Sequence, residues 1–333
     1  LFVKKIILWF SDRSYGIYLI HYPFAAYLKY INYQSNYILL QIFFIFITFL
    51  LSDLTYQKIE NRFRYSYDKY PRYISLFIFA LFIGLFFLVR TNSNFDFKFS
   101  DYVGRNFNSL KSNKIIDNQG IFVIGDSYSQ DFVNILIDGI HIDKKRISTT
   151  FIDMNCGNLF LQNDNKLDKY RESNFAQNCD NTIKYNLVLK EIKENDLLVL
   201  ASNWNVWSVD YLRESLINIR KVFKGQILVV GNKHIGKQSP FFIENLSLKQ
   251  RINLKSTPPN YVNDFNSKIN KSIKSIDNVY FFDIQKLLLD KNGKGIVCDN
   301  RGNLISYDGG HLTKNGVLFI SKKLPTNIKK IIK

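Results

Sequence analysis

The sequence predicts an α/β protein in which helices cover both faces of a parallel sheet, with about three transmembrane helices before the sheet domain. Two patterns carry this prediction. In residues 1–90 the apolar side chains are gathered into long runs, whereas from residue 120 onward short apolar runs alternate with amphipathic stretches. Strands that alternate with helices are typical of a parallel sheet that is covered on both sides.

The first 90 residues contain three apolar segments, which we interpret as membrane spans over residues 15–31, 37–54 and 73–89. A helix needs about 20 apolar residues to cross a bilayer, and about 17 suffice for a short span. The second and third segments reach this length. The first is interrupted by polar residues and a proline, so it fits a span inside a bundle of helices. A buried hairpin of soluble helices is the alternative.

Basic residues flank these segments unequally. They outnumber the acidic residues in 1–14 and 57–72, whereas 32–36 contains none. Because basic loops remain in the cytoplasm, we expect a multi-pass protein of the inner (cytoplasmic) membrane whose chain after about residue 90 is periplasmic. The chain starts at Leu1 and residues 1–30 lack a signal-peptide pattern, so we expect the C-terminal part of a longer polypeptide.

The chain is strongly basic, with a formal net charge of +17 and a pI near 9.5. Such a surface suits anionic lipid, polysaccharide or nucleic acid. The basic residues are scattered along the sequence and no nucleic-acid-binding motif occurs. We therefore expect membrane lipid, and no nucleic acid, among the partners.

The three cysteines are Cys156, Cys179 and Cys298. No C-x-x-C or Cys/His ligand spacing occurs, so we expect no metal site. Cys156 and Cys179 bracket a polar stretch that a disulfide would close in an oxidising compartment, and Cys298 would be left over. Three reduced thiols are the alternative.

Residues 91–119 are polar and weakly periodic, which predicts a linker or a segment that wraps around the next domain. The globular domain is expected over 120–333. Apolar side chains keep helical spacing in 212–223 and 262–273. The strand candidates are 121–124, 197–200, 227–230 and 279–282.

The first strand candidate ends at Gly125, and Asp126 and Ser127 follow where a helix would begin. A serine at the carboxyl end of a parallel strand lies where open α/β sheets place ligands. The helix N-terminus offers unpaired N–H groups to developing negative charge. We interpret Ser127 as a nucleophile, and a plain strand–helix turn with a capping residue is the alternative.

Near the other end of the chain, Asp308 precedes His311 by three residues, and a Thr-capped helix signal follows. An imidazole here can take the proton of Ser127 while Asp308 holds the ring by its other nitrogen. The three residues, in the order Ser, Asp, His, therefore predict a catalytic triad for acyl chemistry.

The Gly-Asp-Ser motif at 125–127 and the Asp-x-x-His pair at 308–311 resemble the SGNH (GDSL-type) esterases and acyltransferases. The resemblance implies an SGNH-hydrolase-like, flavodoxin-like fold. It also implies an oxyanion hole built from the nucleophile's N–H, a glycine N–H and an asparagine side chain. Asn203 matches the asparagine by its position after a predicted strand, and Gly157 is the candidate glycine. The family's Gly-x-Asn-Asp block is absent, and Tyr128 departs from the residue expected after the serine.

Residues 14–24 and 59–64, with the apolar run between them, resemble the last helices of membrane acyltransferase-3 proteins. Several of these, including the OafA-like O-antigen acetylases, carry a further helix and then an extracytoplasmic SGNH domain. This chain matches that order from residue 14 to its end. The acyltransferase helices upstream would be partners within the same polypeptide.

The resemblance implies that the membrane part moves an acyl group, acetyl from acetyl-CoA, across the bilayer, and that no cofactor binds this segment itself. Ser127 would accept the acyl group and pass it to a sugar hydroxyl of a surface polysaccharide. An SGNH-type carbohydrate O-acetylesterase, with water as the acceptor, is one alternative. A non-catalytic binding module with a decayed site is another.

Overall fold

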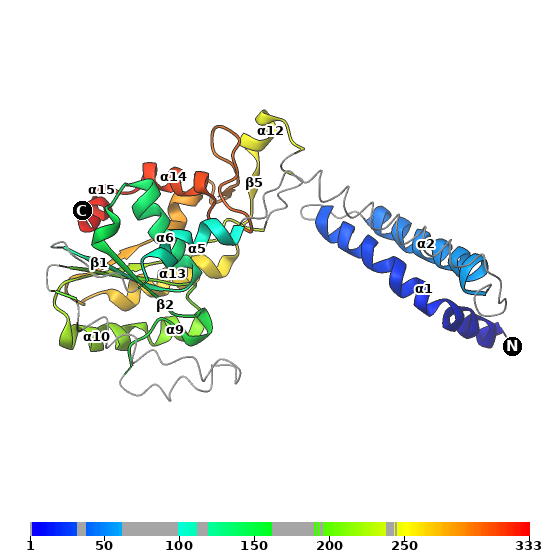
Figure 1. Ribbon diagram of the computed structural model, residues 1–333, viewed down its shortest axis with the longest axis horizontal. Coiled ribbons are helices and arrows are strands. Elements are labelled where there is room, and N and C mark those ends of the chain that lie inside the picture. Colours follow the sequence, from blue (N-terminus) through cyan, green and yellow to red (C-terminus); the bar gives the residue numbers. More distant parts are fainter. Residues whose placement is uncertain are drawn as a thin grey trace. The chain divides into compact units, whose positions relative to one another are not determined.

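The computed structural model describes residues 2–31, 38–61, 99–111, 119–161, 190, 192–193, 196–237, 243 and 245–333. The chain divides into two compact units, Leu1–Asp96 and Phe97–Lys333 (Figure 1).

The described part of the first unit is a pair of helices, α1 (Phe2–Ile31) and α2 (Ile38–Thr55), with a π-helical turn over Tyr56–Glu60. The first two predicted spans thus fall on helices, and the third, 73–89, lies outside the described residues. Among the described residues, no helix has the length and apolarity needed to cross a membrane.

An ion pair joins the two helices of the first unit. The guanidinium of Arg13 on α1 lies 2.6 Å from the carboxylate of Asp53 on α2. It also stacks on the rings of Trp9 and Tyr56, at 4.5 Å and 4.4 Å from their centroids. Because the carboxylate and the faces of the aromatic rings stabilise its positive charge, Arg13 can be buried between the two helices.

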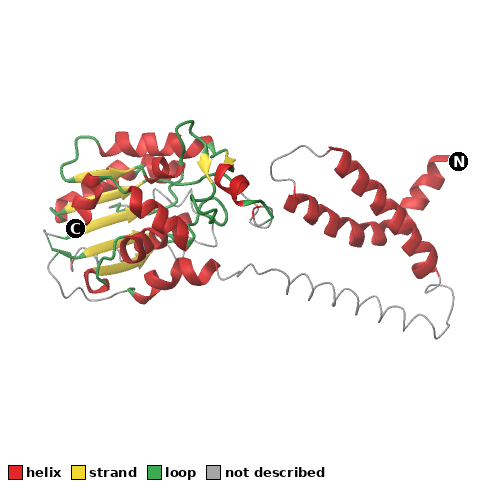
Figure 2. Ribbon diagram, turned by 90° about the horizontal axis from the view of Figure 1, so that it is seen from above, coloured by secondary structure: helices red, strands yellow, loops and turns green. Residues whose placement is uncertain are grey.

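The second unit is built on a five-stranded parallel sheet with the order β2-β1-β3-β4-β6. Figure 2 shows these strands in yellow between layers of helices. The strands are β1 (Ile121–Gly125), β2 (Ile147–Phe151), β3 (Leu197–Ala201), β4 (Gln226–Val230) and β6 (Val279–Phe282). A short antiparallel pair, β5 (Lys255–Ser256) and β7 (Gly295–Ile296), forms a second sheet.

Alternate side chains of each central strand enter two separate cores, as the period of a strand requires. In β1, Val123 faces the core beneath α6 (Ser127–Asn134), and Ile124 faces the core beneath α10 (Leu212–Val222). Figure 1 shows α6 and α14 on one side of the sheet and α9 and α10 on the other. The remaining helices are α9 (Val206–Asp210), α12 (Leu248–Asn253), α13 (Asn260–Ile273), α14 (Lys314–Lys323) and α15 (Thr326–Ile332).

The four predicted strands are all present, and the helices predicted over 212–223 and 262–273 are α10 and α13. Strand β2 was not predicted. Its sequence, Ile-Ser-Thr-Thr-Phe, carries three hydroxyl side chains in a row, so it lacks the apolar run that marks the central strands. It forms one edge of the sheet, where polar residues are tolerated.

The sequence left open a linker or a segment that wraps around the next domain over 91–119, and residues 99–111 pack against that domain. This stretch contains α5 (Phe99–Ser109); Phe107 on the helix and Leu110 in the turn after it are buried in the core shared with α6. The chain then runs beside β2, because the Leu110 carbonyl accepts the N–H of Thr149 at 3.2 Å. Helix α5 is therefore an element of the globular unit.

The strand order places a topological switch between β1 and β3. From β1 the chain moves to β2 on one side, and β3 lies on the other side. In open parallel sheets the crevice outside the carboxyl ends of two such strands binds the ligand. Ser127 follows β1 and Asn203 follows β3, so both belong to this crevice.

Candidate active site

The turn after β1 delivers Ser127 to the first position of α6. Gly125 has a φ of 152°, and a Cβ there would collide with the Ala201 carbonyl of the neighbouring strand. Only glycine permits this approach without strain. Asp126 caps the helix by accepting the N–H of Tyr128 at 2.9 Å. The sequence therefore fixes the serine at a sharp strand–helix turn, with its side chain half-buried.

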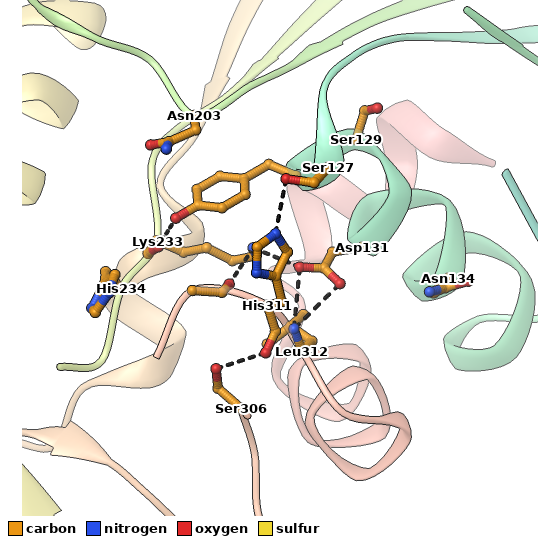
Figure 3. Close-up of polar contacts among 12 residues, drawn as sticks. Ser127, Ser129, Asp131, Asn134, Asn203, Lys233, His234, Ser306, His311 and Leu312 are labelled. Carbon is orange, nitrogen blue, oxygen red and sulfur yellow. Dashed lines mark hydrogen bonds and ion pairs between the residues drawn. The ribbon is translucent and has the colours of Figure 1, made fainter. Parts of the chain in front are cut away.

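The structure brings the three predicted triad residues together, and Figure 3 shows the contact between Ser127 and His311. The Nε2 atom of His311 lies 2.8 Å from the Oγ atom of Ser127, and its Nδ1 atom lies 2.7 Å from Oδ2 of Asp308. With Asp308 ionised, Nδ1 carries the ring proton, so Nε2 accepts the hydrogen bond from the serine hydroxyl. This is the geometry in which an imidazole can remove the serine proton.

Asp308 also folds the loop that carries His311. Its Oδ1 atom accepts the backbone N–H groups of Gly310 and His311, each at 2.8 Å, while Oδ2 accepts the ring. Burial acts to raise the pKa of Asp308, but the hydrogen bonds from His311 and Gly310 outweigh it and hold the pKa well below its usual range. The carboxylate is therefore ionised whenever the neutral imidazole is available as a base.

A second Asp-x-x-His sequence, Asp138 and His141, is used differently. The carboxylate of Asp138 accepts hydrogen bonds from Tyr102 on α5 at 3.1 Å and from Asn106 at 3.3 Å. The Asp-x-x-His spacing alone therefore does not identify the catalytic pair, because the loop that carries the histidine must also turn back toward the serine.

The predicted oxyanion-hole residues differ in how well the structure supports them. The N–H of Ser127 donates to no acceptor among the described residues, as expected at the first position of a helix. The backbone of Asn203 is held beside the serine turn, because its N–H donates to Oδ2 of Asp126 at 2.8 Å, while its side-chain amide lies 4.0 Å from Sδ of Met154. The N–H of Gly157 donates to the Met154 carbonyl at 3.3 Å. This is the N–H that the prediction expected to bind the oxyanion, and in this structure it already has an acceptor.

Asp126 thus links the two sides of the crevice, since its two oxygens bind the turn after β1 and the turn after β3. Burial raises its pKa to about 6, and the two N–H groups partly oppose the rise.

Trp204, which stands where the family block has an aspartate, is a core residue. Its ring N–H donates to the Val230 carbonyl at 2.8 Å, and its exposed fraction is 1%. Its backbone N–H and carbonyl both bind the side chain of Asn232, each at 2.7 Å. At this position, therefore, a buried tryptophan stands in place of the family's aspartate, and its contacts hold the turn of Asn203 in place.

Cys156 is disulfide-bonded, and Cys298 is a buried free thiol. Cys179, the predicted partner of Cys156, lies outside the described residues. Among the described residues, no group of three or more His, Cys, Asp or Glu side chains is arranged to hold a metal ion.

The protein is thus an α/β protein whose parallel sheet has the flavodoxin-like strand order, with a Ser-His-Asp cluster at the switch point. Residues 100–325 match the family model described as "SGNH domain (fused to AT3 domains)". The chain therefore belongs to this family, and the matched range includes nearly all of α5.

Two solved structures are similar to this chain. The periplasmic domain of a lipopolysaccharide acetyltransferase from Salmonella ser. Paratyphi A is 20% identical, with a TM-score of 0.50 over 72% of this chain and 98% of that one. A protein of Streptococcus pneumonia, provisionally described as a platelet activating factor, is 15% identical, with a TM-score of 0.39 over 74% of this chain and 99% of that one. At 20% identity, the similarity to the Salmonella domain shows the fold alone. No curated protein matches the chain.

Proposed function

We propose that this protein transfers an O-acyl group, acetyl in the first instance, to a hydroxyl of a cell-surface polysaccharide through Ser127, His311 and Asp308. The observation that carries the proposal is the continuous chain of hydrogen bonds from the serine hydroxyl through the imidazole to the carboxylate, at 2.8 Å and 2.7 Å. Membership of a family whose SGNH domains are fused to AT3 domains supports the transferase reading.

In the first half-reaction, Oγ of Ser127 attacks the acyl carbonyl carbon while Nε2 of His311 takes the hydroxyl proton. The tetrahedral oxyanion forms near the N–H of Ser127 and the side chain of Asn203. The intermediate then collapses, the bond to the donor breaks, and the imidazolium gives its proton to the leaving group. The products are an acyl-serine and a neutral histidine.

In the second half-reaction, the acceptor hydroxyl loses its proton to Nε2 of His311 and attacks the acyl-serine. The bond to Oγ breaks, the sugar ester forms, and Ser127 regains its proton from the imidazolium. Water in place of the sugar would make the same site an esterase.

The proposal also includes the setting of the domain. A membrane acyltransferase-3 part of the same polypeptide would supply the acyl group from acetyl-CoA, and the SGNH domain would work on the periplasmic side of the inner membrane. Membrane lipid and a surface polysaccharide are the partners that this arrangement requires. The disulfide at Cys156 supports the compartment, because disulfides persist in an oxidising environment.

The test is to replace the chromosomal gene with a Ser127→Ala allele and to measure ester-linked acetate on the surface polysaccharide. The proposal predicts that the acetate is lost. A gain of acetate would assign the esterase reaction instead, and unchanged acetate would overturn both. Ser272→Ala is the matched control, because its hydroxyl bonds the Lys268 carbonyl on α13, and it should leave the acetate unchanged.

A further inference from the structure

A buried ion pair lies behind the imidazole. Asp131 stands four residues after Ser127 on α6, and Lys233 follows β4. The ammonium of Lys233 is 2.7 Å from the carboxylate of Asp131, and the two side chains are 2% and 0% exposed. Neither residue was predicted from the sequence to belong to the site.

Each partner also holds a peptide group next to His311 (Figure 3). The carboxylate oxygens of Asp131 accept the N–H of Leu312 at 3.3 Å and 3.2 Å. The ammonium of Lys233 donates to the carbonyl of Gly310 at 2.6 Å. The backbone on both sides of the histidine is therefore anchored to a charged group.

Tyr128 completes this unit. The Lys233 ammonium lies 3.5 Å from the centroid of the Tyr128 ring, and the Tyr128 hydroxyl donates to the Lys233 carbonyl at 2.8 Å. The same ring meets the imidazole of His311 edge to face, with 5.9 Å between centroids. A ring at this position confines both the lysine and the histidine, which gives a structural role to the unusual residue after the serine.

Stability alone does not account for such a pair. A buried ion pair is expensive to desolvate, and well-packed apolar side chains of similar volume are often as stable or more so. Burial raises the pKa of Asp131, and the attraction to Lys233 opposes the rise, so the negative charge of Asp131 depends on the lysine beside it. What apolar side chains cannot supply is the donor to Gly310 and the acceptor for Leu312.

We infer that Asp131 and Lys233 are positioning residues, which fix the loop of His311 to the helix of Ser127 so that the imidazole stays in line with the hydroxyl. The inference deepens the proposed function and rests on it. Proton transfer requires heavy atoms within about 2.6–3.2 Å, and a misplacement of about 1 Å can cost about 10²-fold in rate.

The test compares Lys233→Met, the double variant Asp131→Asn with Lys233→Met, and a control in the full chain. The control is Asp196→Asn, a buried carboxylate at the other end of the sheet that accepts the N–H groups of Gly120 and Lys193, each at 2.6 Å. Three quantities are measured: the melting temperature, kcat and KM for a chromogenic acetyl ester, and amide hydrogen exchange in residues 306–313.

Lys233→Met is expected to speed exchange in 306–313 and to lower kcat about 10–10²-fold with KM unchanged, because the lysine side chain is buried and offers no surface for binding a substrate. The double variant should regain melting temperature, since no buried charge is left unpaired, but it should not regain kcat, since the Gly310 carbonyl still lacks its donor. Asp196→Asn should lower the melting temperature and leave both kcat and the exchange of the loop unchanged.

The inference is overturned if kcat recovers together with melting temperature in the double variant, because the pair would then act through stability alone. It is also overturned if exchange in 306–313 is unchanged in Lys233→Met. Wild-type protein without Ser127-dependent ester hydrolysis would count against the proposed function, whereas the exchange measurement would still test whether the ion pair holds the loop.

Discussion

The carboxylate of Asp308 performs two tasks, since one oxygen folds the loop and the other orients the imidazole. Asp308→Asn keeps an acceptor for the loop N–H groups but presents an NH₂ group to the ring. The amide then favours the tautomer that carries its proton on Nε2, which cannot accept from Ser127. We expect kcat for a chromogenic acetyl ester to fall about 10²–10⁴-fold with little change in KM. A fall of less than about threefold would remove Asp308 from the mechanism.

Because of the buried Asp126, we expect the free energy of unfolding to depend on pH. Its pKa is about 6 in the folded protein and about 4 in the unfolded chain, because burial disfavours the charge. The folded state therefore holds a proton that the unfolded state has lost between about pH 4 and about pH 6, and its stability falls as the pH rises through this window. The effect amounts to about 3 kcal/mol for two pKa units.

The comparison of wild type with Asp126→Asn isolates this effect, because the asparagine cannot ionise. Urea unfolding followed by tryptophan fluorescence should give a difference in unfolding free energy, wild type minus variant, that falls by about 3 kcal/mol from about pH 4 to about pH 7. A difference that stays constant across this range would show that Asp126 titrates normally.

The sequence allowed prediction of the triad because each member lies in a local motif whose geometry is set by its neighbours. Ser127 follows a strand that ends in glycine, and Asp308 reaches His311 within one loop turn. Asp131 and Lys233 have no such motif, because they meet only when α6, the turn after β4 and the C-terminal loop come together. The one sign in the sequence was that Asp131, a charged residue, directly precedes the buried Phe132.

At the scale of elements, the central strands were predictable because both of their faces are buried and their sequences are continuously apolar. Strand β2 and helix α5 were not, since each contributes a single apolar face at the edge of the unit. Helix α5 begins within a polar stretch, and the contribution of this segment to the core depends on Phe107 near the end of the helix and on Leu110 just after it.

Phe107 provides the test of this assignment. Its side chain is 0% exposed and its ring lies edge to face with Phe151, at 6.4 Å between centroids. Phe107→Ala should lower the free energy of unfolding by about 3–5 kcal/mol, measured by urea titration. Val222→Ala on α10, where the side chain is 62% exposed, should change it by less than about 0.5 kcal/mol. A loss below about 1 kcal/mol for Phe107→Ala would show that residues 99–111 do not contribute to the core and act as a linker.

At the scale of the whole molecule, the disulfide at Cys156 constrains the segment after β2, where Cys156 directly precedes Gly157. Cys156→Ser should lower the free energy of unfolding by about 2–4 kcal/mol. A reductant should destabilise the wild type and the Cys298→Ala variant but leave Cys156→Ser unchanged. Equal sensitivity of all three proteins to the reductant would exclude a stabilising disulfide.

The family match covers residues 100–325, and the part of the first unit that the structure describes is a pair of helices. The sequence predicted this order because apolar runs and strand–helix alternation occupy different parts of the chain. The proposed acceptor sugar cannot be predicted from the sequence in this way, since selectivity for a sugar depends on the shape of a crevice formed by several loops rather than on one motif.

The most direct test of the account is the rate at which a fluorophosphonate probe reacts with the full chain, with the modified residue located by mass spectrometry. The account predicts that the probe modifies Ser127, and that His311→Ala slows the reaction at least about 10²-fold because the hydroxyl loses its base. Modification of a different serine, or an equal rate in the His311 variant, would contradict it.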